Sequence, residues 1–102
     1  MAVKLLMTWD IRPGREQDYF EFVVREFMPG LQRLGLEPSD AWYTMYGTER
    51  HPQIMAGVLA PTRDDLTRIL ASSQWDTLIE NLNEYVERFQ YKIVSARRGF
   101  QL

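Results

Sequence analysis

The sequence repeats one order of predicted elements: a short apolar strand, a long aromatic-rich helix and a second strand. Residues 3–11 and 53–60 open the two halves, and residues 41–47 and 90–96 close them, because aliphatic, aromatic and β-branched side chains concentrate there. Right-handed crossovers would place both helices on the same face of the sheet. The order β-α-β-β-α-β therefore predicts an α+β domain with a four-stranded antiparallel sheet and helices on one face only.

The first helix is predicted from apolar residues that recur at three- and four-residue steps after the Arg-Pro-Gly turn at residues 12–14. These residues are Tyr19, Phe20, Val23, Val24, Phe27, Leu31 and Leu34. Proline disfavours helical geometry at the residue before it, so we expect a kink or a division near Pro29 and Gly30.

Two capping signals mark the second helix. Thr62 with Asp65 three residues later has the spacing at which a side chain satisfies free N–H groups of the first turn, and Ser73 with Asp76 repeats it. We therefore expect a break between two helical segments at residues 71–73. The second segment is predicted to extend as far as Phe89. Its expected buried stripe is Leu78, Leu82, Tyr85, Val86 and Phe89.

Composition limits the classes of partner. The 102 residues suffice for a single domain, residues 1–102, and the absence of cysteine excludes disulfides and thiolate metal sites. A formal net charge of -2 would not attract nucleic acid or an anionic membrane. The first apolar run is too short for a signal peptide, and no stretch has the length of a membrane-spanning helix. We expect a cytoplasmic protein without a metal, a nucleic-acid partner or a membrane partner.

The sheet face without helices predicts a partner. In the first strand Val3, Leu5 and Trp9 share one face, but Leu6 lies among polar residues on the other face. The predicted strand at 53–60 also carries apolar residues on both faces, and an exposed apolar patch of this kind marks an interaction site. We expect a second copy to cover it about a two-fold axis, which gives a homodimer with the two sheets packed into a barrel.

Local motifs add a family resemblance. The turn at residues 12–14, the strand that begins Trp42-Tyr-Thr and ends at Gly47, and the helix that begins Leu70-Ala-Ser-Ser-Gln-Trp75 together resemble the dimeric α+β barrel superfamily. The chain looks most like its NIPSNAP-like and antibiotic-biosynthesis-monooxygenase-like members. The resemblance implies a ferredoxin-like homodimer with a pocket in each subunit between sheet and helices. Members include cofactor-independent monooxygenases, haem-degrading enzymes, lactone isomerases, cyclases and proteins without known activity.

Candidate catalytic side chains are few. His51 is the only histidine, and it lies in a predicted hairpin tip, where a solvated surface role is favoured over a general base or a metal ligand. Haem-degrading relatives carry an axial histidine on a helix, and neither predicted helix has one here. Asp10, at the end of the first strand, would act as a base if it were desolvated at a pocket mouth. An ordinary ion pair at the turn is the favoured alternative.

Aromatic and hydroxyl side chains supply the candidate ligand site. Aromatic rings suit a flat apolar compound but also suit a core, and a few hydroxyl groups would orient the ligand. The candidate ligand-binding residues are Thr8, Trp42, Thr44, Tyr46, Trp75 and Tyr91. One expected function is to bind or transform a small apolar or aromatic compound without a cofactor, as a monooxygenase or isomerase would. The alternative is a non-catalytic homodimeric interaction or stress-type protein in which all the apolar lining is dimer interface.

Overall fold

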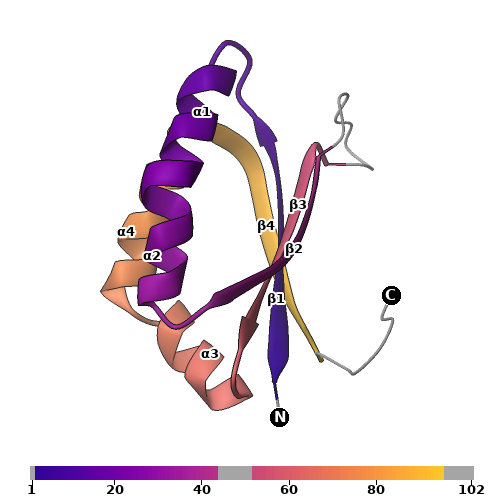
Figure 1. Cartoon of the computed structure of the whole chain (residues 1–102), viewed down its shortest axis with the longest axis vertical. Coiled ribbons are helices and arrows are strands. Elements are labelled where there is room, and N and C mark those ends of the chain that lie inside the picture. Colours follow the sequence, from indigo (N-terminus) through magenta and orange to yellow (C-terminus); the bar gives the residue numbers. More distant parts are fainter. Residues whose placement is uncertain (1, 44–51, 96–102) are drawn as a thin grey trace.

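The computed structural model describes residues 2–43 and 52–95. In these ranges four strands form one antiparallel sheet in the order β2-β3-β1-β4, and the helices lie against one face of it (Figure 1). The strands are β1 (Val3–Ile11), β2 (Glu37–Tyr43), β3 (Ile54–Ala60) and β4 (Val86–Ser95). The helical segments are α1 (Glu16–Phe22), η1 (Val23–Phe27), α2 (Met28–Arg33), α3 (Arg63–Leu70) and α4 (Ser73–Leu82). The predicted ferredoxin-like α+β arrangement is confirmed.

Two strands begin earlier than predicted. β2 begins at Glu37 instead of residue 41, and its predicted end at residues 44–47 lies outside the described residues, as does most of the predicted hairpin loop. β4 begins at Val86 instead of residue 90, so the prediction that the second helix reaches Phe89 is wrong: α4 ends at Leu82. Apolar and polar side chains alternate from Phe89 to Ile93, and this strand period prevails over the helical spacing.

The first crossover helix is continuous, and its middle turn, η1, is a π-helix. Pro29 stands in the first turn of α2, directly after this wider turn, where its missing N–H is accommodated. The π turn brings Phe22 and Phe27, five residues apart, onto the buried face. It also rotates two predicted members of the buried stripe outward, since Phe20 is 49% exposed and Val24 is 71% exposed. For these two residues the prediction was wrong.

The second crossover breaks where its capping signals predicted. The Thr62 hydroxyl accepts a hydrogen bond from the Asp65 N–H at 3.0 Å and begins α3. α4 is capped one residue earlier than expected, because the Ser72 hydroxyl accepts from the Trp75 N–H at 3.2 Å. Each cap satisfies an N–H that has no partner within its helix. In the described ranges no helix has both the length and the apolar character needed to cross a membrane.

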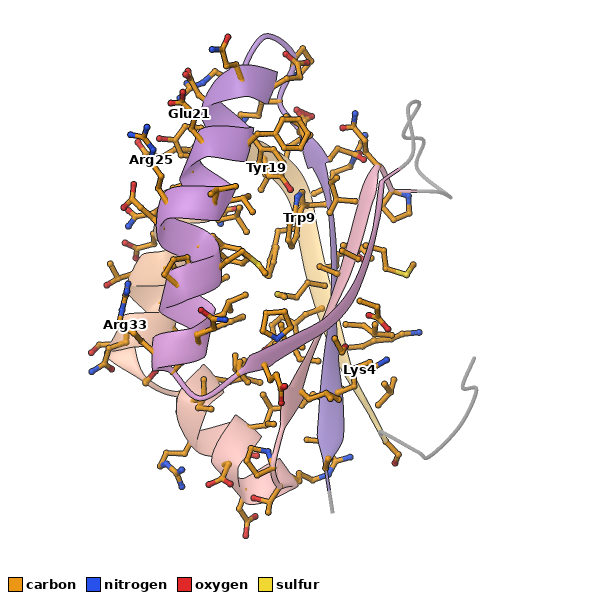
Figure 2. The ribbon with its side chains drawn as sticks, in the orientation of Figure 1. Lys4, Trp9, Tyr19, Glu21, Arg25 and Arg33 are labelled. Carbon is orange, nitrogen blue, oxygen red and sulfur yellow. The ribbon has the colours of Figure 1, made fainter. Side chains whose placement is uncertain are left out.

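The core lies between the helices and one face of the sheet. Leu5 and Met7 of β1 have no exposed surface, and Trp9 is 2% exposed, whereas the intervening residues of the strand face the other way. Figure 2 shows this division, with Trp9 and Tyr19 between sheet and helix and Lys4 on the opposite side of the sheet. The predicted facing of β1 is confirmed. Within the described residues no helix or strand covers the second face, which we call the bare face.

Candidate functional site

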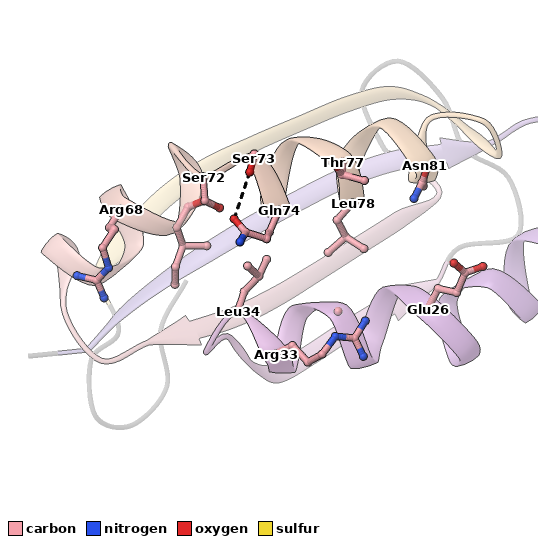
Figure 3. Close-up of a pocket in the computed structure, with 12 residues that line it drawn as sticks. Glu26, Arg33, Leu34, Arg68, Ser72, Ser73, Gln74, Thr77, Leu78 and Asn81 are labelled. Carbon is pink, nitrogen blue, oxygen red and sulfur yellow. Dashed lines mark hydrogen bonds between the residues drawn. The ribbon is translucent and has the colours of Figure 1, made fainter.

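A groove between α2 and α4 has a volume of about 750 Å³ and lies on the outer side of the helices, away from the sheet (Figure 3). Of the predicted ligand-binding residues whose side chains the structure describes, Thr8, Trp75 and Tyr91, none lines it. The candidate site suggested by the sequence must therefore be sought elsewhere, among the aromatic side chains that pack on the sheet.

Aromatic rings form a connected group beneath the helices, with Trp9 at its centre. The Trp9 ring stacks on Phe89 with 5.9 Å between ring centroids, and it meets Phe27 edge to face at 5.8 Å. Its indole Nε1–H donates a hydrogen bond to the Tyr19 hydroxyl at 3.0 Å. Trp9 and Tyr19 are both buried, so this bond satisfies a donor that water cannot reach. Packing and hydrogen bonding therefore act on the same ring.

The aromatic group reaches the surface at β4. Tyr91 packs against Phe89 at 6.3 Å between centroids and meets Trp75 of α4 edge to face, also at 6.3 Å. Trp75 is buried, whereas Tyr91 is 48% exposed. We call these three residues the aromatic edge. The structure thus brings together two of the predicted ligand-binding residues, Trp75 and Tyr91, at a place open to solvent.

A β-bulge in β4 produces this arrangement. The pairing of β1 with β4 shifts register between Thr8 and Asp10, opposite Arg88, whose backbone is left-handed with φ 59°. The inserted residue lets both Val86 and Phe89 face the helices although they are three residues apart. Without the bulge, strict alternation would turn one of these side chains to the bare face.

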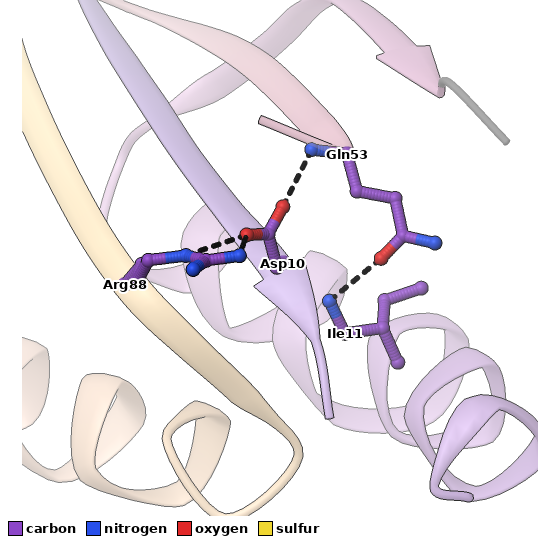
Figure 4. A network of polar contacts seen from close by, with 4 residues as sticks. All are labelled: Asp10, Ile11, Gln53 and Arg88. Carbon is purple, nitrogen blue, oxygen red and sulfur yellow. Dashed lines mark hydrogen bonds and ion pairs between the residues drawn. The ribbon is translucent and has the colours of Figure 1, made fainter. Parts of the chain in front are cut away.

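Asp10 anchors the bulge through a network of polar contacts (Figure 4). Its Oδ1 accepts from the Gln53 N–H at 2.7 Å, and its Oδ2 accepts from Nε of Arg88 at 2.7 Å and also from Nη2. The Gln53 side-chain oxygen accepts from the Ile11 N–H at 2.9 Å. Asp10 is 6% exposed, so its carboxylate ties the ends of three neighbouring strands together in a nearly buried position.

The ion pair expected near the turn is therefore made with a residue far along the chain. Arg12, the neighbouring cation, instead donates to the carbonyl oxygen of Asn83 at 3.1 and 3.2 Å. Sequence reasoning missed Arg88 and Gln53 because their contacts with Asp10 depend on strand pairing and on the bulge. Through these contacts Asp10 holds Gln53 and Arg88, and with them the start of β3 and the bulge of β4, in place.

The left-handed backbone at Arg88 provides a test of this network. We expect both Arg88→Ala and Arg88→Gly to lower the free energy of unfolding by about 1–3 kcal/mol, since each leaves a nearly buried carboxylate short of a donor. Glycine also relieves a backbone cost of about 1–2 kcal/mol that alanine retains. The glycine variant should therefore be more stable than the alanine variant by about 1 kcal/mol in urea denaturation. Equal stabilities of the two variants would show that the left-handed backbone at residue 88 carries no such cost.

The bare face carries an ion pair among apolar and polar side chains. Lys4 Nζ lies 2.9 Å from Asp40 Oδ2, and Asp40 Oδ1 is buried and has no hydrogen-bond partner among the described residues. Gly57 lies beneath this carboxylate, and a Cβ at that position would collide with Oδ1. Glycine in a central strand therefore marks a close approach here. On the same face the register places the apolar residues Leu6, Met55, Leu59 and Val94 together with the polar residues Thr8, Gln90 and Lys92.

The predicted ligand-binding residues do not meet at one point. Thr8 lies on the bare face, opposite Met55 in the register, whereas Trp75 and Tyr91 lie on the helix side. The backbone of Trp42 pairs with Met55, but the Trp42 side chain is not among those that the structure describes. Thr44, Tyr46 and His51 lie outside the described residues. In residues 2–43 and 52–95 no group of three or more acidic, histidine or cysteine side chains could hold a metal ion.

Solved structures share this fold. A NIPSNAP family protein from Agrobacterium tumefaciens has a TM-score of 0.69 and 16% identity, over 96% of this chain and 95% of its own. A dimeric ferredoxin-like protein of unknown function from Bacteroides fragilis has a TM-score of 0.62 and 14% identity, over 93% and 96%. A variant of SnoaB, a cofactor-independent oxygenase from Streptomyces nogalater, has a TM-score of 0.66 and 14% identity, over 96% and 95%.

These likenesses confirm the resemblance at the level of the fold: the chain has the architecture of NIPSNAP-like proteins and of SnoaB. No protein-family model and no curated protein matches the sequence. Activity must therefore be argued from the side chains.

Proposed function

We propose that the protein is a homodimer that binds a small aromatic compound at the aromatic edge and acts as a cofactor-independent oxygenase or isomerase. The observation that carries the ligand site is Tyr91, a large ring 48% exposed that continues a connected group of buried rings. A flat ligand stacked there would remove apolar surface from water and add ring contacts. The fold shared with SnoaB, a cofactor-independent oxygenase, supports the reaction class.

The homodimer is supported by the bare face. Met55, the second residue of β3, is 36% exposed. On the same face Leu6 of β1 lies diagonally across from it, and Leu59 lies four residues further along β3. Lys4 and Asp40 neutralise one another, which lowers the cost of burying them against a partner. Two such faces would pack across a two-fold axis at the spacing usual for stacked sheets. A neighbour of the same fold from Bacteroides fragilis is dimeric.

The ligand proposal is tested with a panel of quinols, haem and polyphenols. We expect at least one quinol or polyphenol to raise the melting temperature and to quench tryptophan fluorescence, because Trp75 is in contact with Tyr91. Tyr91→Ala should weaken that binding about ten-fold, because the ligand would lose one ring contact and the apolar area buried in it. Val24→Ala, which removes another exposed apolar side chain, should leave the binding unchanged.

A non-catalytic dimer is the second candidate, and one feature of the packing supports it. Leu5, Met7 and Leu66 have no exposed surface in the layer between sheet and helices, and that layer is filled by side chains in the described residues. In this case the apolar surfaces serve assembly alone. Indifference to the whole panel, together with an intact dimer, would overturn the ligand proposal and select this candidate.

A further inference from the structure

The outer groove between α2 and α4 has a floor shaped by one glycine. Gly30 and Leu34 of the first crossover helix face Ile69 and Leu78 of the second. A Cβ at Gly30 would lie 2.9 Å from Cδ1 of Leu78, so the end of the Leu78 side chain fills the space beside this glycine and would have to shift for a larger residue. The floor is apolar, and the volume of about 750 Å³ is within the range of small-molecule pockets.

One rim of the groove consists of neutral hydrogen-bonding side chains. Ser73, Thr77 and Asn81 recur every four residues along α4, which places them on one side of the helix, and Gln74 stands beside them (Figure 3). These groups both donate and accept hydrogen bonds. No carboxylate of α4 lines the groove. This rim can therefore bind a polar or anionic group without repelling it.

The charged residues of the groove are two arginines and one glutamate: Arg33, Arg68 and Glu26. Arg68 is held by Asp65 through a hydrogen bond of 2.6 Å. That bond, with the bond from Thr62, keeps the pKa of Asp65 below its usual value, so the pair remains ionised at neutral pH. Arg33 forms no ion pair with any residue that the structure describes. Arg33 is therefore the cation available to a ligand.

We infer that this groove is a second binding site, for a small amphipathic carboxylate. Its apolar part would rest on Leu34, Ile69 and Leu78, its carboxylate would pair with Arg33, and the polar rim of α4 would complete the hydrogen bonds. The site is separate from the aromatic edge and does not depend on the function proposed for that edge. An uncharged analogue of the same shape should bind more weakly, because it cannot form the charge-assisted pair.

The test is an amide NMR titration of the full chain with 4-phenylbutyrate and with its uncharged amide. We expect saturable shifts confined to the residues that line the groove on α2, α3 and α4 and to their neighbours, including Gly30, Ile69 and Thr77, with the amide binding about ten-fold more weakly. Arg33→Gln should weaken binding of the carboxylate by a similar factor. Arg63→Gln, a matched exposed arginine on α3 that does not line the groove, should leave it unchanged.

A second variant acts in the opposite direction. Asp65→Asn removes the carboxylate that holds Arg68, so it should strengthen binding of 4-phenylbutyrate several-fold while the backbone cap at Thr62 is retained. Absence of saturable shifts, equal binding of acid and amide, or an Arg33→Gln variant that binds normally would overturn the inference. None of these outcomes changes the result of the quinol panel, so the two proposals fail separately.

Discussion

Met55→Asp is expected to weaken self-association about a thousand-fold. Met55 lies on the bare face, and its register neighbours, Thr8 and Trp42, bring no cation that would neutralise an aspartate. Because a two-fold axis repeats each contact, one substitution would bury two unpaired carboxylates in the dimer interface. Burying them costs several kcal/mol of association free energy. A loss of about 4 kcal/mol corresponds to a thousand-fold weaker dimer. Met55 is already 36% exposed, so the separated chain should fold normally.

Sedimentation velocity over a micromolar concentration series checks this expectation. The variant should sediment as a species near the chain mass of 12.1 kDa, and the unmodified protein as one near twice that mass. Val24→Asp places the same charge on the helical surface, where the side chain is 71% exposed, and it should leave the dimer intact. A Met55→Asp variant that remains dimeric would mean that the bare face is not the contact surface.

Trp9→Ala is expected to lower the free energy of unfolding by about 3–5 kcal/mol. The substitution removes a stacked contact with Phe89, an edge contact with Phe27 and the hydrogen bond to Tyr19. It leaves a cavity at the centre of the aromatic group, where close packing prevents full collapse. A loss of this size is a large part of the stability of an ordinary domain.

Guanidinium denaturation followed by circular dichroism measures this loss, with protein concentration held constant because the proposed dimerisation would contribute to apparent stability. Trp9→Phe should retain part of the packing and give an intermediate value. Val24→Ala should change stability by no more than about 0.5 kcal/mol, as expected at an exposed position. A cost below about 1 kcal/mol for Trp9→Ala would be incompatible with its central place in the core.

The fold was predictable where one period dominates the sequence. Burial alternates along β1 from Val3 to Trp9, so the burial of Leu5 and Trp9 and the opposite facing of Leu6 followed from the two-residue period of a strand. Around Phe89 the helical and strand spacings compete, and tertiary pairing with β1 decided for the strand. Likewise, the π turn shifts Val24 out of a stripe that a regular helix would have buried, and no single residue type signals such a turn.

The candidate site was predictable only in part. Trp75 and Tyr91 were singled out as aromatic residues, and they meet because a helix and a strand distant in sequence pack together. The partner of Asp10 could not be read from the sequence, since Arg88 reaches it through a bulge that changes the register. Gly57 did carry a signal, because glycine inside a strand often marks a close approach, and here the approaching group is Asp40.

Native mass spectrometry of freshly purified protein tests most directly the central proposal, that a second copy covers the bare face. The chain mass is 12.1 kDa, and the proposal predicts that the dominant ions at micromolar concentration carry twice that mass. A spectrum that contains only the single chain at this concentration would contradict it.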